Sequence, residues 1–297
     1  MVEGANYTLH MIQEIDSFHP LLLNIGYAVH DSDWNWTDVN SPFFRIYYVT
    51  KGTAQVTFVG RTITLRPNHL YVIPAFTSHN CSCNGCFEHY YLHIYEDDSS
   101  GCSILEDLDL PSEIPAEPLD LELMDMLYRT NPNSQIPHSN PSTYDTPATL
   151  MHNIIKNKHR AVHDRVASRG IIYLLLSHFL KDARPKNAST DNRIIKVVNF
   201  IRKNINHDID INTMAEICCL SKAHFIRLFK SEMNITPLQY IVKKKIEKAQ
   251  LLLITQDMAI KEVAYSLGYD NYSYFTKLFK KQTGLTPHDY KEQNQRH

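Results

Sequence analysis

The chain has 297 residues, a formal net charge of −2 and 43% apolar residues. This length predicts about two domains, each able to bury a core of its own. The longest nearly unbroken apolar run, residues 170–180, is far shorter than the roughly 20 residues of a membrane-spanning helix. Residues 1–11 lack the basic and apolar regions of a secretory signal, so we expect a cytoplasmic protein with no membrane partner.

The near-zero net charge conceals two oppositely charged parts. Residues 1–190 contain 13 Lys and Arg against 21 Asp and Glu, which is a net charge of −8. Residues 191–297 contain 17 Lys and Arg against 11 Asp and Glu, which is a net charge of +6. A basic part within a nearly neutral chain is typical of a protein in which one domain alone binds nucleic acid.

In chain order, residues 43–95 have the pattern of short β-strands. Apolar and polar residues alternate over 54–58 and again over 62–65, on either side of a turn signal at Gly60. Residues 90–95 are rich in strand-forming side chains. Short strands separated by turns predict a β-sandwich or a small β-barrel in the N-terminal part.

Helical spacing of apolar residues follows the strands. It extends over 119–129, 149–159 and 162–180, and the last of these segments has a broad apolar face. That face can pack on its own domain or on a second subunit, and the spacing alone does not choose. Residues 131–147 are rich in Pro, Ser and Asn and are expected to form a loop, while 183–190 are expected to form a linker.

The C-terminal part, residues 191–297, is predicted to be helical and contains an internal repeat. Residues 225–230 (FIRLFK) resemble 275–280 (FTKLFK) at an offset of 50, and further matches downstream keep this offset. Upstream, residues 214–215 match 263–264 at an offset of 49. The second copy therefore has one extra residue at one place, which is what a turn between two helices tolerates.

Each copy has the pattern of a helix, a tight turn and a second helix. In the first copy Ser221 is suited to cap a second helix that buries apolar residues at i, i+3 and i+4 from Phe225. The second copy has Gly268 in its turn and the same spacing from Phe275, and residues 238–254 form one helix between the copies. Two structural helical hairpins are the alternative. The repeat and the basic outward faces favour two DNA-binding helix-turn-helix units.

Two blocks carry a resemblance to a known family. Residues 221–253 (SKAHFIRLFKSEMNITPLQYIVKKKIEKAQLLL) and 260–290 (IKEVAYSLGYDNYSYFTKLFKKQTGLTPHDY) are similar to the DNA-binding domain of AraC/XylS family transcription regulators. The resemblance extends over about 193–291. It implies an α+β protein: an N-terminal cupin-like β-barrel that senses a small molecule, dimerisation helices, and a C-terminal all-α domain with two helix-turn-helix units.

The same resemblance implies which side chains meet DNA. The base-reading positions are three in each second helix: Ala223, Ile226, Arg227, Ser273, Tyr274 and Lys277. The phosphate contacts are Ser221, Lys222, Lys230, Asn271, Lys280 and Lys281. Ala223 and Ile226 can offer only apolar contact, for example to a thymine methyl group, so Arg227 is the expected main reader of the first unit.

The N-terminal part resembles a regulatory cupin over residues 52–79. A ligand pocket is expected in the barrel mouth. Its candidate residues are aromatic side chains beside Arg and His, with both tryptophans coming from an N-terminal arm: Arg45, Tyr47, His79, Tyr91, His93, Trp34 and Trp36. Such a set suits a sugar or a small acid. The alternative is that these rings simply fill a core.

No metal or cofactor is expected. Metal-dependent cupin enzymes need a closely spaced His pair on early strands, and residues 44–58 contain no His. The ligand types between His79 and His89 include Cys81, Cys83 and Cys86, at spacings that match none of the usual zinc sites. A reduced hairpin is the expectation for this segment, with metal binding or redox sensing as the alternative.

These observations predict four regions: an effector-sensing barrel at 1–118, a helical dimerisation region at 119–182, a linker at 183–190 and a DNA-binding domain at 191–297. The predicted function is sequence-specific transcription regulation, an activator by family resemblance, with no enzymatic activity. The expected partners are double-stranded promoter DNA, a small effector, a second copy of the chain and, for an activator, RNA polymerase. The alternatives are a constitutive DNA-binding protein whose barrel only dimerises, and a metal-dependent cupin enzyme.

Overall fold

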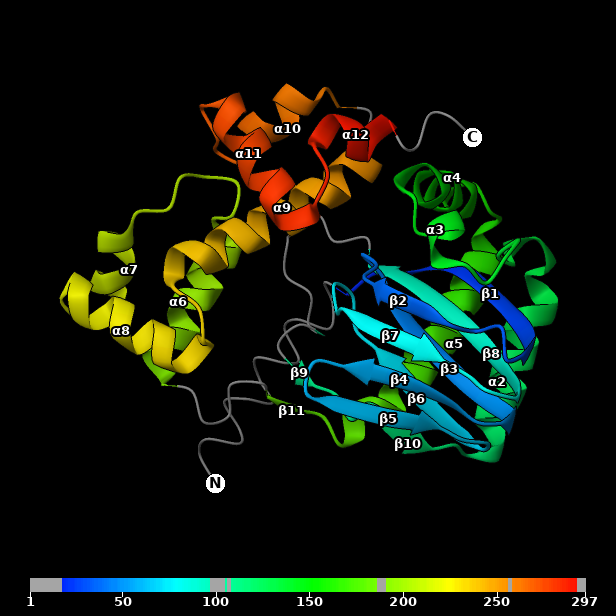
Figure 1. The fold of residues 1–297 in the computed structure, drawn as a ribbon. Coiled ribbons are helices and arrows are strands. Elements are labelled where there is room, and N and C mark those ends of the chain that lie inside the picture. Colours follow the sequence, from blue (N-terminus) through cyan, green and yellow to red (C-terminus); the bar gives the residue numbers. More distant parts are fainter. Residues whose placement is uncertain (1–17, 97–104, 106–107, 186–190, 256–257, 293–297) are drawn as a thin grey trace. The chain divides into compact units, whose positions relative to one another are not determined.

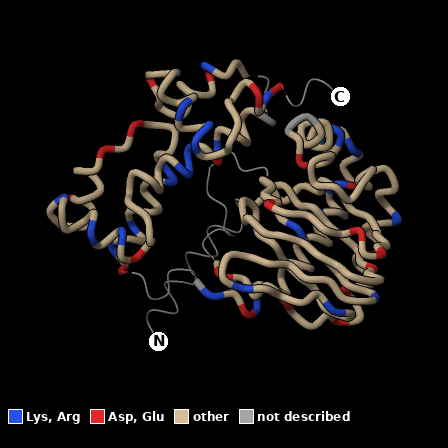
Figure 2. The backbone as a smooth tube through the Cα atoms, viewed as in Figure 1, with Lys and Arg blue, Asp and Glu red and all other residues tan. Residues whose placement is uncertain are grey.

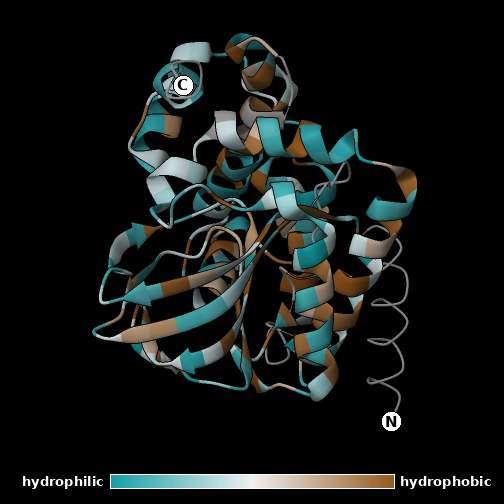
Figure 3. Cartoon of the chain, turned by 90° about the vertical axis from the view of Figure 1, so that its right-hand side faces the viewer, coloured by the Kyte–Doolittle hydropathy of each residue, from teal (hydrophilic) through white to brown (hydrophobic). Residues whose placement is uncertain are grey.

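The computed structural model describes residues 18–96, 105, 108–185, 191–255 and 258–292. The described residues form two compact units, which divide between Arg184 and Pro185 (Figure 1). None of the helices in these ranges combines the length and apolar character needed to cross a membrane. Helices in the chain carry both hydrophilic and hydrophobic residues around their circumference (Figure 3).

Antiparallel strands form two sheets in the N-terminal unit. The five-stranded sheet has the order β1-β8-β3-β6-β10, and the four-stranded sheet has the order β2-β7-β4-β5. Their strands are β1 (Pro20–Asp31), β2 (Trp36–Val39), β3 (Phe44–Gly52), β4 (Ala54–Phe58), β5 (Arg61–Leu65), β6 (His69–Ile73), β7 (His79–Ser82), β8 (Cys86–Glu96) and β10 (Glu113–Pro115). A further two-stranded pair joins β9 (Leu108–Asp109) to β11 (Arg184–Pro185).

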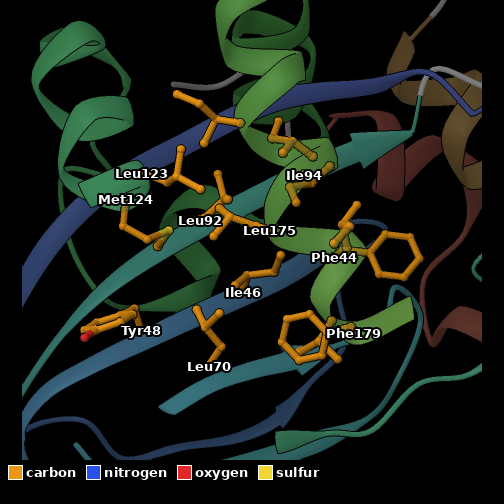
Figure 4. Packing of buried hydrophobic residues seen from close by; sticks show 14 of the residues in the cluster. Phe44, Ile46, Tyr48, Leu70, Leu92, Ile94, Leu123, Met124, Leu175 and Phe179 are labelled. Atoms are coloured by element: carbon orange, nitrogen blue, oxygen red, sulfur yellow. The ribbon is translucent and has the colours of Figure 1, made fainter. Parts of the chain in front are cut away.

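The five-stranded sheet is buried on both faces because its side chains alternate between two cores. Phe44 and Ile46 of β3 belong to a core completed by helices α2 (Pro118–Thr130) and α5 (Val162–Lys181) (Figure 4). Tyr47 and Val49 of β3 belong to a second core shared with the four-stranded sheet. The N-terminal unit therefore has three layers: helices, the larger sheet and the smaller sheet. The closure of the sheets into a cupin-like barrel stays a prediction.

Three shorter helical segments follow α2: η2 (Pro132–Ser134), α3 (Pro141–Tyr144) and α4 (Pro147–Lys158). The predicted loop at 131–147 thus contains short helices. The predicted N-terminal arm was wrong, because Trp36 lies in β2 and Trp34 is buried just before it. Both belong to the sheet domain. The long strand β1 was not predicted. Its nearly continuous apolar run lacks the alternation of a strand with one buried face.

Within the described residues from 191 onward, the C-terminal unit contains helices and no strands, as predicted. Its helices are α6 (Asn192–Lys203), α7 (Ile211–Ile217), α8 (Lys222–Met233), α9 (Pro237–Thr255), α10 (Ile260–Ser266), α11 (Tyr272–Thr283) and α12 (Pro287–Glu292). It has two separate cores, one for each repeat. Helix α9 contributes Tyr240 and Ile241 to the first core and Ile246 and Ala249 to the second. One continuous helix therefore joins the two repeats, as the sequence predicts.

Candidate DNA-binding interface and effector site

The two repeats have the same local structure. Helices α7 and α10 each have 7 residues, and α8 and α11 each have 12. Residues 221–230 and 271–280 also share one burial pattern, position by position. The connection between the two helices is one residue longer in the second repeat, so the extra residue lies in the turn, where the change of offset predicts it.

Capping side chains fix where the second helix of each repeat begins. The Ser221 hydroxyl accepts a hydrogen bond from the His224 amide at 3.4 Å, and Asn271 accepts one from the Tyr274 amide at 3.0 Å. Such a cap contributes about 1 kcal/mol to helix stability. The Ser221 hydroxyl and the Asn271 amide group each keep a donor beyond this bond, which a DNA phosphate can accept.

The tight turns need left-handed backbone, and each repeat supplies it differently. Cys219 has φ of 53° in the first turn, whereas Gly268 has φ of 72° at the matching place in the second. A β-carbon on Gly268 would lie 2.8 Å from the backbone carbon of His207, so only glycine fits there without a shift. The second turn is thus packed against the loop before α7 of the first repeat.

The predicted base-reading residues lie in the first halves of α8 and α11. Ala223, Ser273 and Tyr274 are exposed, and so are the cations Arg227 and Lys277. Accessible side chains at the start of the second helix are what base reading in the major groove requires. These five positions stay predicted DNA contacts.

Ile226 differs from the other predicted readers because it is half-buried and packs against the first core. Its first role is therefore packing. The exposed His224, two residues earlier, occupies the place that Tyr274 has in the second repeat. The sequence-based set of readers omits His224, although the offset of 50 residues points to it.

Six lysines and arginines make both second helices basic on their outer faces: Lys222, Arg227, Lys230, Lys277, Lys280 and Lys281. All six are exposed, and none forms a salt bridge with another residue of the described ranges. Lys and Arg are distributed over the helices of this unit (Figure 2). Exposed cations without salt bridges in the described ranges, on the second helix of each repeat, are the electrostatic feature expected of a surface that binds phosphate.

A buried lysine connects the two repeats. The ammonium of Lys245 in α9 donates hydrogen bonds to the carbonyl of His207 at 2.8 Å and to that of Leu267 at 2.6 Å. His207 precedes the first unit, and Leu267 ends the first helix of the second unit. The ammonium also lies 5.0 Å from the centre of the Tyr269 ring. Burial lowers the pKa of Lys245.

In the N-terminal unit, the predicted effector residues come together in the layer between the two sheets. Arg45 and Tyr47 of β3 alternate with residues that face the helices, and so do Tyr91 and His93 of β8. Trp34 packs edge-on against Tyr47 with the ring centres 5.8 Å apart. All seven candidates except Trp36, which is half-buried, are almost fully shielded from solvent.

Three further residues belong to this layer and were not predicted. His89 of β8 lies 5.1 Å from the ring centre of Tyr47, and it shares the alternation of Tyr91, so the sequence contained a signal for it. Tyr144 stacks on His93 with ring centres 5.1 Å apart. Asp145 lies 3.0 Å from the guanidinium of Arg45. Tyr144 and Asp145 come from the predicted loop, and no pattern in the sequence brings them here.

Burial keeps the histidines of this layer neutral. It lowers the pKa of His79 to about 4, and the charge of Arg45 lowers it further in the same direction. Burial also holds the pKa values of His89 and His93 well below the ordinary range. The layer therefore has one persistent positive charge, that of Arg45, among neutral rings.

The cysteine segment is divided between two environments. Cys81 and Cys83 are buried in the core between the sheets, and burial raises the pKa of the Cys81 thiol to about 12. Cys86 is exposed, with its sulfur 3.6 Å from a carboxylate oxygen of Glu88. In the ranges that the structure describes, no three His, Cys, Asp or Glu side chains gather as metal ligands would. The expectation that this protein holds no metal stays a prediction.

Comparison with known proteins adds a family to these observations. Residues 214–293 match the family model of a helix-turn-helix domain. The MmsAB operon regulatory protein of Pseudomonas aeruginosa is 34% identical over 93 residues, which are 31% of this chain and 30% of that protein. The arabinose operon regulatory protein of Escherichia coli is 32% identical over 102 residues, which are 34% of this chain and 35% of that protein.

The chain thus matches about a third of the length of these curated relatives. Among solved structures, ToxT from Vibrio cholerae aligns with 91% of this chain and 98% of its own, at 12% identity and a TM-score of 0.46. The matched domain contains the repeated helices and the linking helix α9 described above. Through this domain, the chain is similar to these regulatory proteins of bacterial operons.

Proposed function

We propose that this protein is a sequence-specific DNA-binding transcription regulator controlled by a small molecule. The observation that carries the proposal is the pair of matching helix-turn-helix units on one continuous helix, with six exposed cations on their second helices that form no salt bridge within the described ranges. The relatives that share the domain are regulatory proteins of operons, which supports the same role for this chain. No enzymatic activity is proposed.

In this proposal each second helix enters a major groove, and the two units occupy successive groove segments on one face of the DNA. Arg227 is suited to a bidentate contact with guanine, and Lys277 to a base or a phosphate. His224 and Tyr274 add donors at matching positions of the two helices. Lysines at the far ends of α8 and α11, including Lys230 and Lys280, contact phosphates.

The N-terminal unit serves as sensor and dimerisation module in this proposal. The effector, a sugar or a small acid, binds between the two sheets, where Arg45 and the aromatic rings lie. A second copy of the chain binds the exposed apolar side of α5, which presents Val162, Val166 and Leu174 to solvent. Effector binding shifts the population of dimers that present the DNA-binding units correctly on promoter DNA, where the activator form recruits RNA polymerase.

A genome-wide binding map tests the proposal. The map of the unaltered protein is compared with those of an Arg227→Ala/Lys277→Ala double variant and of Lys51→Ala, an exposed lysine of the N-terminal unit, as control. We expect discrete sites upstream of genes, which are lost with the double variant and retained with the control. Sites that survive in the double variant would refute DNA recognition by α8 and α11.

The dense ring packing between the sheets favours one alternative, a constitutive regulator whose N-terminal unit only dimerises. Thermal-shift screening of sugars and small acids separates the two. Stabilisation by at least one compound, with a matching change in operator affinity, supports the sensor. Operator binding that is indifferent to every compound supports the constitutive form.

A further inference from the structure

We propose that the effector carries a carboxylate, which binds Arg45 by displacing the side chain of Asp145. The segment from Ile136 to Asp145 is then a tethered competitor that fills the effector site while no effector is bound. This inference rests on the proposed function, because it names the chemical class of the effector and the way in which its binding is sensed.

Arg45 is an unusual occupant of the centre of a sheet. It is 1% exposed and lies among rings in the layer between the sheets. A buried charge is costly unless it is paired and hydrogen-bonded. Its carboxylate partner does not come from either sheet but from Asp145, which lies 100 positions along the chain. A core that only had to be filled would need neither charge.

The pairing of Arg45 with Asp145 is incomplete. The Nη2 atom of Arg45 donates to Oδ2 of Asp145 at 3.0 Å and to the Ser41 hydroxyl at 2.5 Å, and the Ser41 hydroxyl donates to the same Oδ2. The other carboxylate oxygen, Oδ1, is buried and has no hydrogen-bond partner within the described ranges. Arginine and carboxylate pair best through two parallel hydrogen bonds. A free carboxylate can adopt that geometry, whereas the backbone restrains Asp145.

Burial also weakens Asp145 as a competitor. It raises the pKa of the Asp145 carboxyl, and the nearby charge of Arg45 offsets this rise only in part. The ionised form of Asp145 is therefore less stable in this buried position than it would be in water. An effector anion that completes the hydrogen bonds of Arg45 is expected to take its place.

Several further polar atoms of the layer lack partners in the described ranges, and two of them indicate what else the effector offers. The Nδ1 atom of His79 lies 2.8 Å from the Thr77 carbonyl, so Nδ1 bears the proton and Nε2 is left as an acceptor. That Nε2 atom is buried and has no partner in the described part of the chain. The same holds for the Trp36 indole nitrogen, which is a donor. The His79 acceptor is close enough to Arg45 for the arginine charge to lower its pKa, so the pair suits a hydroxy acid in which a hydroxyl group donates to His79.

The segment that would be displaced is attached at both ends and leads directly into the helices. The Ile136 amide donates to the Tyr91 hydroxyl at 3.0 Å, and Ile136 packs against the core between the sheets. At the other end, Tyr144 stacks on His93 next to Asp145. Helix α4 begins two residues after Asp145 and packs against β1, as α5 does. Release of Asp145 therefore transmits effector binding to the helices proposed to form the dimer.

Calorimetry on the full chain tests the proposal with matched pairs of acids and neutral compounds: gluconate with glucose, and lactate with lactamide. The decisive variant is Asp145→Asn, which removes the competing charge and leaves Arg45 in place. Glu113→Gln is the control, because the Glu113 carboxylate pairs with Arg66 at 2.8 Å and accepts from the Tyr71 hydroxyl at 3.2 Å, and it contacts neither Arg45 nor Asp145. We expect an acid to bind, its neutral counterpart not to bind, and Asp145→Asn to tighten the affinity about tenfold, because the binding-competent state becomes more populated. Arg45→Met abolishes the binding.

Hydrogen exchange provides a readout that does not depend on the choice of acid. Asp145→Asn is expected to speed exchange of the amides between Ile136 and Asp145 at least several-fold, whereas Glu113→Gln leaves them unchanged. Unchanged exchange in Asp145→Asn refutes the claim that this segment is a tethered competitor. Equal binding of acids and neutral compounds, or no acid binding by Asp145→Asn, refutes the claim that the effector carries a carboxylate. Either result leaves the proposed regulator intact if the protein still binds its genomic sites, so the two failures are distinguishable.

Discussion

Lys245 offers a direct test of how the two helix-turn-helix units are held together. Lys245 is 4% exposed, and its ammonium joins the carbonyl of His207, before the first unit, to the carbonyl of Leu267, within the second. Lys245→Met keeps the length of the side chain and removes both hydrogen bonds. The change therefore acts on the junction between the units and leaves each of the two cores with its own apolar residues.

The size of the effect follows from the two acceptors that lose their donor. A buried acceptor left unsatisfied costs about 1–3 kcal/mol. The Leu267 bond is buried and the His207 bond is only partly buried, so their loss together costs about 2–4 kcal/mol, and removal of the buried ammonium offsets part of this because its desolvation is no longer required. Burial lowers the pKa of Lys245, which indicates that this offset is real. We expect a net loss of about 3 kcal/mol in the free energy of unfolding of the C-terminal unit.

Two probes separate the units in a urea titration. Both tryptophans of the chain, Trp34 and Trp36, lie in the N-terminal unit, so their fluorescence monitors that unit alone. Far-UV circular dichroism adds the helices of the C-terminal unit. Lys245→Met is expected to lower the midpoint of the circular-dichroism transition and to leave the fluorescence transition unchanged. Lys243→Met, an exposed lysine of the same helix, is the control.

DNA binding provides the second readout of the junction. Loosened units bind a complete operator less tightly, because their fixed spacing no longer favours simultaneous contact, whereas an isolated half-site is bound as before. A Lys245→Met protein that is as stable as Lys243→Met, and as tight on the complete operator, would refute the role of this lysine.

Three other substitutions test separate features. Gly268→Ala is expected to destabilise the C-terminal unit by about 2 kcal/mol or more, because Gly268 has φ of 72° and a β-carbon would meet His207; an unchanged circular-dichroism midpoint contradicts this. For His79, burial lowers the pKa from 6.5 to about 4. Its contribution to the free energy of unfolding is therefore fully present above pH 6.5 and is lost as the pH falls toward 4, by about 1.4 kcal/mol per pH unit. The urea midpoint of the fluorescence transition is measured as a function of pH. If His79→Gln does not reduce the pH dependence of this midpoint, the assignment to His79 is wrong. Arg227→Ala should relax specificity at one base pair at a cost of about 1–3 kcal/mol, whereas Lys280→Ala should weaken all sites alike. Gel shifts on permuted operators measure both affinities. If the two variants lose equal affinity on every sequence, the assignment of Arg227 as a base reader is refuted.

The repeat could be predicted almost completely from the sequence because its structure is determined locally. Apolar spacing, the caps Ser221 and Asn271 and the offset of 50 residues all act within single helices or turns. The tertiary role of Ile226 could not be predicted from this spacing, because only the packed core shows that its side chain is half-buried. His224 could have been predicted as a base reader, since it lies at the position that matches Tyr274.

The interior of the N-terminal unit was predictable only in part. Alternation along β3 and β8 places Arg45 and His93 on one face, which the sequence indicates. The carboxylate that pairs with Arg45 comes from a segment rich in Pro, Ser and Asn, whose position depends on contacts across the whole unit. Periodicity carries no information about such a contact. The most informative feature of the candidate effector site therefore came from the structure.

The two helix-turn-helix units share one scaffold and differ in chemistry, which has a consequence for the DNA they read. Positions with the same burial carry His224 and Arg227 in α8 but Tyr274 and Lys277 in α11. Arginine forms a bidentate pair with guanine, whereas lysine is a point charge that discriminates less between bases and phosphates. Under the proposed function, equal geometry with unequal side chains predicts different preferred sequences for the two adjacent groove segments. We therefore expect a single chain to bind its operator in one direction.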